Sequence, residues 1–249
     1  MINLSVNVNK VATVRNSRGG TVPSVLEAAQ ICIDAGVQGI TVHPRADARH
    51  ITFDDVRQLT RLLAPYKRRV EFNIEGDPRP DLLDLVREVR PDQCTLVPVL
   101  PFEITSQAGW PPDTPADEMR RVVADLRARG VRVSLFVDPQ TAPVDWAADI
   151  GADRVELYTE PYARAFHAGE AVRRASFEMY VAVARHAHSR RLDVNAGHDL
   201  DLDNLVLFRT LPYLAEVSIG HALISHAIFV GLERSVREYR SVLAGDPRS

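Results

Sequence analysis

The stretch Gly39-Ile-Thr-Val-His43-Pro-Arg45 is a short apolar, β-branched run that ends in a histidine and a proline. Such a run is typical of a buried strand, and the proline directs the chain into an extended turn. A helix is expected next, because Thr52 precedes Phe53-Asp-Asp as an N-cap with acidic residues in the first turn. The stretch therefore predicts one strand–loop–helix unit with a polar carboxyl end.

The same unit recurs along the chain. Strand-like runs are expected at residues 4–8, 39–42, 70–74, 94–97, 131–137, 154–157, 192–195 and 216–219. Helical patterns are expected at residues 24–35, 53–63, 80–89, 115–129, 144–150, 176–189, 202–211 and 221–243. About eight such units predict a TIM (β/α)8 barrel, one α/β domain over residues 1–249, with extra helical segments in the βα loops. A doubly wound open sheet is the alternative, disfavoured because no Gly-rich phosphate loop follows the first strand.

Composition narrows the function classes. The 249 residues are 45% hydrophobic with a net charge of −3, which suits one globular domain and gives no basic footprint for nucleic acid. No apolar run is long enough to span a membrane. The N-terminus resembles a first strand and not a signal peptide, and Cys32 and Cys94 are expected to be buried thiols. We expect a cytoplasmic protein.

Four histidines lie in the loops that follow three of the predicted strands. They are His43, His50, His198 and His221, four of the eight in the chain. The carboxyl ends of the strands meet at one face of a barrel, and histidine readily exchanges protons near neutral pH. The pattern predicts an active site at that face.

Polar and apolar residues alternate along residues 70–75, so that Glu71, Asn73 and Glu75 share one strand face. Inside a barrel, desolvation would raise the pKa of such a carboxyl group. Glu75 lies nearer the open end and is the better acid–base candidate. The alternative is that one of these carboxylates pairs with an arginine in the barrel. Glu156 and Tyr158 alternate in the same way along a later strand.

Several residues are candidates for binding anions or substrate oxygens. Asn7 and Asn9 would share a face of the first strand, where they form either a polar barrel floor or amide contacts to substrate. Arg18, which precedes two glycines, could bind an anion through its guanidinium group. Gly220 and His221 begin a helix, and the N–H groups there suit phosphate.

Two connections are longer than a barrel requires, Pro98 to Pro115 and Thr159 to Arg174. Long βα loops commonly serve as lids or substrate contacts, although each could be a packed surface excursion. Gly109 and the hydroxyls of Thr105 and Ser106 favour a lid that closes on phosphate in the first connection.

A metal site is the second choice for the strand-end histidines. Four histidines and Glu75 carry suitable ligand atoms, but the chain lacks an HExxH motif. Arg18 and Arg45 near the same site suit anions better than a divalent cation.

The motifs as a set resemble those of the pyridoxine 5'-phosphate synthase family of vitamin B6 biosynthesis. The matching stretches are residues 6–19, 39–51, 73–75, 133–138, 194–198 and 219–222. The resemblance implies a TIM barrel assembled as a homo-octamer, a tetramer of dimers. It also implies condensation of 1-deoxy-D-xylulose 5-phosphate with 3-amino-2-oxopropyl phosphate into pyridoxine 5'-phosphate, phosphate and water, without a cofactor or a metal.

The resemblance also assigns roles to individual residues. His43 resembles the family's base, Glu75 a second acid–base carboxylate and His198 its proton donor. The implied substrate-binding residues are Asn7 and Arg18 for the aminoketone phosphate, Arg45, His50 and Thr105 for the deoxyxylulose phosphate, Gly220 and His221 for phosphate, and Asn9, Lys10 and Asp199.

The chain departs from one common form of the family pattern. Asn9-Lys10 stands where many members have Asp-His, Asp199 stands where many have glycine, and Val99 replaces an acidic residue. Only Lys10 and Lys67 could serve as a lysine nucleophile, and Lys67 precedes the third strand at the opposite face. A metal-dependent or Schiff-base aldolase and a non-catalytic phosphate-sugar binding module remain the alternatives.

Overall fold

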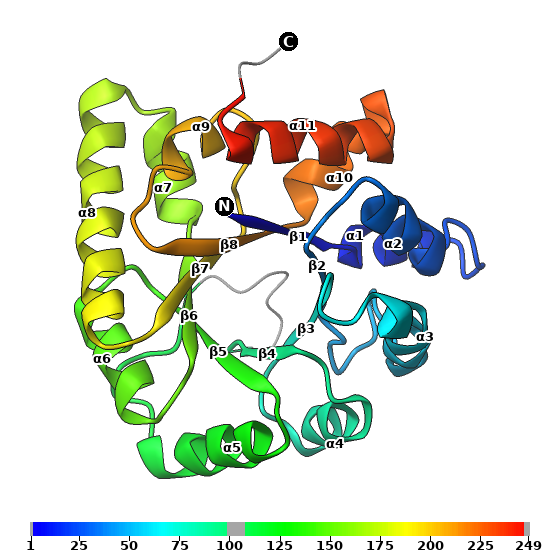
Figure 1. Cartoon of the computed structure of the whole chain (residues 1–249), viewed down its shortest axis with the longest axis horizontal. Helices are drawn as coiled ribbons and strands as arrows, with labels where there is room; N and C mark the ends of the chain where they lie inside the picture. Colours follow the sequence, from blue (N-terminus) through cyan, green and yellow to red (C-terminus); the bar gives the residue numbers. More distant parts are fainter. Residues whose placement is uncertain (1, 99–107, 247–249) are drawn as a thin grey trace.

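The structure, a computed structural model, describes residues 2–98 and 108–246. Its centre is a closed barrel of parallel strands in chain order, and helices surround it (Figure 1). The strands are β1 (Asn3–Asn7), β2 (Gly39–Val42), β3 (Glu71–Gly76), β4 (Gln93–Leu96), β5 (Arg132–Val137), β6 (Arg154–Tyr158), β7 (Asp193–Gly197) and β8 (Leu214–Ile219). β8 pairs with β1 and closes the barrel, which confirms the TIM barrel and excludes the open sheet.

Each strand is followed by one or more helices. They are α1 (Asn9–Asn16), α2 (Val25–Asp34), α3 (Phe53–Leu63) with the 3-10 turn η1 (Ala64–Tyr66), α4 (Pro80–Val89), α5 (Ala116–Ala128), α6 (Thr141–Asp149), α7 (Glu160–Phe166), α8 (Glu170–Ser189), α9 (Leu205–Phe208), α10 (His221–Val230) and α11 (Leu232–Ala244). Among the described helices, none is long and apolar enough to cross a membrane.

The lumen of the barrel is polar because the strands alternate polar and apolar residues. The register aligns Thr41 with Asn73, Asn73 with Gln93, and Asn195 with Glu216 across neighbouring strands. Side chains in such register share one face of the sheet. Hydrogen bonds join them, for example from Thr95 Oγ1 to Asn73 Oδ1 at 3.0 Å.

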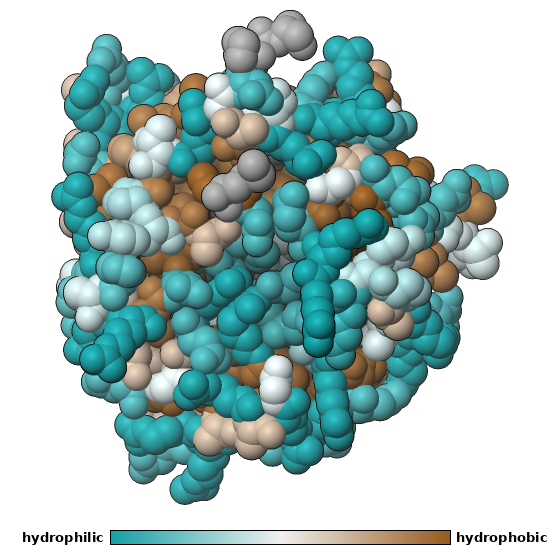
Figure 2. Space-filling view, viewed as in Figure 1, coloured by the Kyte–Doolittle hydropathy of each residue, from teal (hydrophilic) through white to brown (hydrophobic). Residues whose placement is uncertain are grey.

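The apolar face of every strand packs outward under the helices. Val6, Ile40, Ile74 and Leu135 are fully buried there. In the view of Figure 2, hydrophilic residues cover the middle of the molecule and apolar surface shows mainly between the barrel and the outer helices. The main hydrophobic core is therefore the layer between sheet and helices, and the lumen is left for polar chemistry.

Three expectations about secondary structure were wrong. Asn9 does not extend the first strand, because α1 begins at that residue. The expected loop from Thr159 to Arg174 contains α7 and the start of α8, since Glu160 and Pro161 provide good first-turn residues. The expected single helix after His221 is broken at Gly231, whose φ of 89° ends α10.

The connection from Pro98 to Pro115 is described only in part, and Thr105 and Ser106 lie outside the described residues. Gly109 packs against β5, because a Cβ on it would lie 2.3 Å from Val137 Cα. Trp110 Nε1 also donates to the Leu96 carbonyl at 2.9 Å. Gly109 therefore serves close packing against β5 in this structure, and the predicted lid, which falls mainly outside the described residues, stays a prediction.

Candidate active site

A cavity of about 870 Å³ lies at the carboxyl ends of the strands. The predicted site residues that line it are Asn7, Asn9, Lys10, His43, Arg45, His50, Glu75, His198, Asp199, Gly220 and His221. Arg18 is exposed after the end of α1 and is not among the lining residues, and Thr105 lies outside the described residues. The volume falls within the usual range for small-molecule sites.

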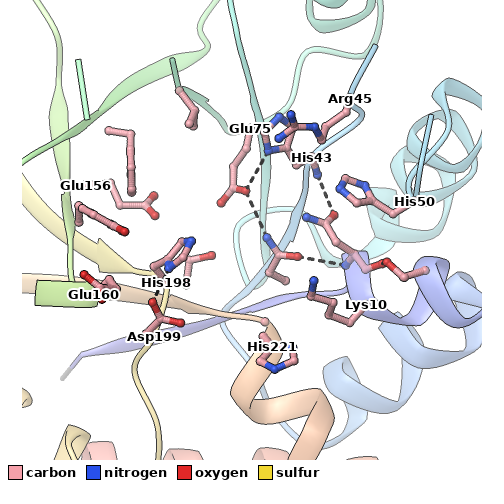
Figure 3. Close-up of a pocket in the computed structure, with 18 of the residues that line it drawn as sticks. Lys10, His43, Arg45, His50, Glu75, Glu156, Glu160, His198, Asp199 and His221 are labelled. Atoms are coloured by element: carbon pink, nitrogen blue, oxygen red, sulfur yellow. Dashed lines mark hydrogen bonds and ion pairs between the residues drawn. The ribbon is translucent and has the colours of Figure 1, made fainter. Parts of the chain in front are cut away.

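Figure 3 shows the labelled side chains on two sides of this cavity. Lys10, His43, Arg45 and His50 come from the β1 and β2 side. Glu156, Glu160, His198 and Asp199 come from the β6 and β7 side, and Glu75 lies between the two groups. A substrate on either side would therefore meet Glu75 at the middle of the site.

His43 is buried at the end of β2 with 7% of its surface exposed. Its backbone N–H donates to Asn9 Oδ1 at 2.9 Å, and its ring nitrogen Nε2 is buried without a hydrogen-bond partner among the described residues. Burial, together with the smaller effects of the nearby charges of His50 and Arg45, lowers the pKa of His43 to about 3. At neutral pH His43 is therefore a neutral imidazole that can accept a proton.

Glu75 lies beside His43 in the cavity wall. Asn7 Nδ2 donates to Glu75 Oε2 at 3.2 Å, and the same oxygen lies 3.9 Å from His43 Nδ1. Burial, with a smaller effect of the Glu216 carboxylate, raises the pKa of Glu75 to about 8, although the hydrogen bond from Asn7 acts in the opposite direction. At pH 7 both partners are mostly uncharged, so this contact is a neutral acid beside a neutral base and not an ion pair.

Glu156 is a second buried carboxyl group in the site. Burial, together with the charge of Glu75, raises its pKa well above the ordinary value. Gly197 on the neighbouring strand makes room for it, since a Cβ there would lie 2.4 Å from Glu156 Oε1. The alternation of Glu156 with Tyr158 was visible in the sequence, but only the barrel register brings Glu156 to the cavity.

His198 is held by its neighbours at the end of β7. Its Nδ1 lies 2.7 Å from Asp199 Oδ2, and its ring packs edge-on against Tyr158 with 5.3 Å between the ring centroids. Its φ is 96°, which is uncommon for any residue other than glycine. Strained backbone of this kind is concentrated at functional sites. The carboxylate of Asp199 fixes the orientation of the imidazole.

Cationic and donor groups surround the remaining wall of the cavity. Lys10, Arg45 and Arg49 lie on the β1 and β2 side, Arg164 comes from α7, and His221 begins α10. Arg49 and Arg164 were not among the residues predicted to bind substrate. Arg164 was not predicted because α7 was expected to be a loop. Arg49 was not predicted because the chain is rich in arginine, and nothing in the sequence distinguishes the arginine at position 49 from the others. The grouping of Lys10, Arg45 and Arg49 on one side of the cavity favours anionic ligands there.

Metal ligands are not grouped in the described part of the chain. Among those residues, no three His, Cys, Asp or Glu side chains are placed to hold one metal ion. The donor set instead combines acids, bases and arginines, which suits proton transfer on anionic molecules.

Known proteins were compared with this chain at the levels of family, sequence and fold. Residues 4–245 match the family model described as pyridoxal phosphate biosynthesis protein PdxJ. A pyridoxine 5'-phosphate synthase of Porphyromonas gingivalis is 51% identical over 98% of this chain and all of that protein. A pyridoxine 5'-phosphate synthase of Bacteroides fragilis is 50% identical over 98% of this chain and all of that protein.

Solved structures support the fold. Phosphoribosyl anthranilate isomerase from Thermotoga maritima aligns with a TM-score of 0.62 at 13% identity, over 98% of this chain and all of that one. Thiamine phosphate pyrophosphorylase from Pyrococcus furiosus aligns with a TM-score of 0.62 at 14% identity, over 98% of this chain and 96% of that one. These two likenesses establish the barrel alone. The family match, in contrast, spans nearly the whole sequence, and the chain belongs to the PdxJ family of pyridoxal phosphate biosynthesis proteins.

Proposed function

We propose that this chain condenses 1-deoxy-D-xylulose 5-phosphate with 3-amino-2-oxopropyl phosphate into pyridoxine 5'-phosphate, with release of phosphate and water. Relatives about 50% identical over their full length carry the name of that synthase. The observation that carries the proposal is the two-sided cavity, in which a protonated Glu75 lies beside a neutral His43, with the cations Lys10, Arg45 and Arg49 on the same side.

Two phosphorylated substrates require two places for anions. Lys10, Arg45 and His50 supply one on the β1 and β2 side. Arg164 and the N-terminus of α10 at His221 line other parts of the wall. The N–H groups at a helix start favour phosphate. This division supports a reaction between two anionic molecules held in one cavity.

The reaction needs several proton transfers, for imine formation, loss of water, loss of phosphate and ring closure. In this proposal His43 is the base, Glu75 the acid–base carboxyl group and His198 the proton donor on the opposite side. A bound phosphate dianion would offset the charge of Arg45, which lowers the pKa of His43 in the free protein. Substrate binding then favours proton uptake by His43.

The test is direct. Purified protein is mixed with both phosphates, and released phosphate and pyridoxine 5'-phosphate are measured over time. Reactions that lack either substrate are the controls. Stoichiometric release of phosphate and product supports the proposal, whereas binding of both ligands without turnover would identify a binding module instead.

A Schiff-base aldolase is the second candidate, because Lys10 lines the cavity. The synthase needs no lysine nucleophile, since the aminoketone substrate brings its own amine. Borohydride treatment during turnover should therefore leave Lys10 unmodified in the synthase, and mass spectrometry of peptides would reveal a trapped adduct on Lys10 in the aldolase.

We expect activity without a metal ion. The cavity wall is rich in arginine, and the described residues offer no metal-ligand cluster. Protein treated with a chelator and then dialysed should keep its turnover within about twofold, a difference worth less than 1 kcal/mol. Loss of turnover that a single metal ion restores would contradict this prediction.

A cytoplasmic location and a homo-octamer belong to the same proposal. The buried free thiols Cys32 and Cys94 suit a reducing compartment. The octamer is implied by the family resemblance and is testable by light scattering on the purified protein.

A further inference from the structure

His50 is fixed in the cavity wall by its own backbone neighbourhood. The N–H of Ile51 donates to His50 Nδ1 at 2.9 Å. The carbonyl oxygen of His50 accepts from Asn16 Nδ2 at 2.8 Å and from Arg15 Nη2 at 3.3 Å. Both the ring and the main chain of His50 are thus held from outside the cavity.

The groups that hold His50 form one connected cluster. Arg15 binds Asp55 with both terminal nitrogens, at 2.5 and 2.9 Å, and its Nε donates to Asn16 Oδ1 at 2.9 Å. Asp55 also accepts from the N–H and the hydroxyl of Thr52, both at 2.8 Å, in the capping box of α3. The cluster therefore joins the end of α1 to the start of α3 around the His50 loop.

The hydrogen bond from Ile51 decides the tautomer of His50. A nitrogen that accepts a hydrogen bond cannot carry a proton, so the neutral ring has its proton on Nε2. Adding a proton to Nδ1 would place two N–H groups against each other. The charges of Arg45 and Lys10 oppose a second proton as well, and burial is the main reason that the pKa of His50 falls to about 4.

None of Arg15, Asn16 and Asp55 lines the cavity, whereas His50 does. We propose that Arg15, Asn16 and Asp55 are a positioning unit that fixes His50 as a neutral imidazole, with its Nε2–H presented to the phosphorylated ligand beside Arg45 and Lys10. This inference rests on the proposed function for the identity of that ligand, 1-deoxy-D-xylulose 5-phosphate.

The positioning unit separates the tasks of two histidines whose rings lie 6.1 Å apart. His43 has a buried Nε2 without a partner among the described residues and can take up a proton. His50 donates a hydrogen bond and keeps its proton. A fixed donor stays aligned with the ligand, whereas a loose one loses the benefit of correct geometry.

Kinetics of Asn16→Asp test the unit. This variant keeps the oxygen that Arg15 Nε contacts but replaces the amide that holds the His50 carbonyl. The KM for 1-deoxy-D-xylulose 5-phosphate should rise about tenfold, which corresponds to a lost hydrogen bond of about 1.4 kcal/mol. The KM for the aminoketone phosphate should change less than about twofold, well below the cost of one hydrogen bond.

Ser17→Ala is the matched control. Ser17 follows Asn16, is exposed, and its hydroxyl donates to the Val14 carbonyl within the same helical segment. Both KM values should match those of the wild type. Thermal unfolding of both variants shows whether a change comes from loss of fold, and calorimetric titration with 1-deoxy-D-xylulose 5-phosphate reports affinity without turnover.

The tautomer has its own test. Protein labelled with ¹⁵N at histidine is sedimented and studied by solid-state NMR at neutral pH, with His50→Gln to assign the signals. Nε2 of His50 should be protonated and Nδ1 not. In Asn16→Asp the two nitrogens should show a mixture of tautomers.

The outcomes separate this inference from the proposed function. If the wild type makes no pyridoxine 5'-phosphate, the proposed function fails, and the NMR experiment alone then decides whether His50 is a fixed donor. If the wild type is active but Asn16→Asp matches it in both KM values, the positioning unit is wrong. A proton on Nδ1 of His50 in the wild type would also overturn the inference.

Discussion

Glu71 and Glu75 lie on the same face of β3 but meet opposite surroundings. Glu71 forms an ion pair with Arg132 and lies 3.8 Å from Arg154 at the amino end of the barrel. Glu75 contacts Asn7 and His43 in the cavity, where burial raises its pKa to about 8. Position along one strand therefore separates a structural carboxylate from a candidate catalytic one.

Replacing Glu75 with Gln keeps the volume and removes the titrating group. We expect kcat to fall by about 10²–10⁴-fold, the usual cost of a lost proton shuttle, with the melting temperature little changed. Glu71→Gln is the control and should destabilise the fold by about 1–3 kcal/mol while turnover is retained, because it weakens the pairing of Arg132. A folded Glu75→Gln protein with near-normal kcat would contradict the assignment.

The variants Arg45→Ala and Arg18→Ala test whether each arginine binds a different substrate. A charge-assisted hydrogen bond contributes about 1.5–3 kcal/mol, so Arg45→Ala should raise the KM for 1-deoxy-D-xylulose 5-phosphate about 10- to 150-fold. Arg18→Ala should instead raise the KM for the aminoketone phosphate. Because Arg18 is exposed outside the cavity, an unchanged KM for both substrates in Arg18→Ala would remove it from the site.

At the scale of elements, a residue on one strand limits the space for a side chain on the neighbouring strand. Gly197 on β7 faces Glu156 on β6, and a Cβ on Gly197 would also lie 3.1 Å from the Ser218 carbonyl on β8. In the pairing of β6 with β7, Glu156 lies opposite Asn195 and Tyr158 lies opposite Gly197. The position of the Glu156 carboxyl group thus depends on the neighbouring residue of β7 being a glycine.

Gly197→Ala should move the Glu156 carboxyl group by a fraction of an ångström or more. Small displacements in an active site cost about 10²-fold in rate, so we expect a decrease in kcat of that order in a folded protein. Gly20→Ala is the control, because no atom lies within 4 Å of a Cβ added there. Equal kcat values for the two variants would show that Glu156 tolerates the shift.

For the whole molecule, the polar lumen links stability to pH. Burial raises the pKa values of Glu75 and Glu216 to about 8, and it raises that of Glu156 as well. The folded state therefore keeps protons that the unfolded chain releases near pH 4.5. Each unit of pKa difference corresponds to about 1.4 kcal/mol. This contribution is fully present below pH 4.5 and is lost as the pH rises through about 8.

The free energy of unfolding should accordingly fall between pH 5 and pH 8. Urea unfolding at matched protein concentration measures the decrease. Glu216→Gln removes one of the three groups without touching the cavity wall, so its stability should fall less over the same interval. An identical decrease in the variant and the wild type would mean that Glu216 does not titrate in this range.

The sequence by itself determined the barrel and most of the predicted residues that line the candidate cavity. β2 and α4 have the predicted bounds, because a β-branched run before His-Pro and an amphipathic helix after a proline are local signals. His43, Glu75 and His198 were predicted to lie together, and they line one cavity, because strand ends converge at one face of a barrel, whichever neighbours they have.

Only the tertiary structure decided the partners of these residues. The pairing of Glu75 with Asn7, the space at Gly197 for Glu156 and the cluster that holds His50 join residues up to 68 positions apart. α1 and α7 were missed because they have only 8 and 7 residues, and helices that short depend on tertiary packing more than on local propensity. Protonation states depend on burial and on charges from several strands, and no local pattern in the sequence specifies either of them.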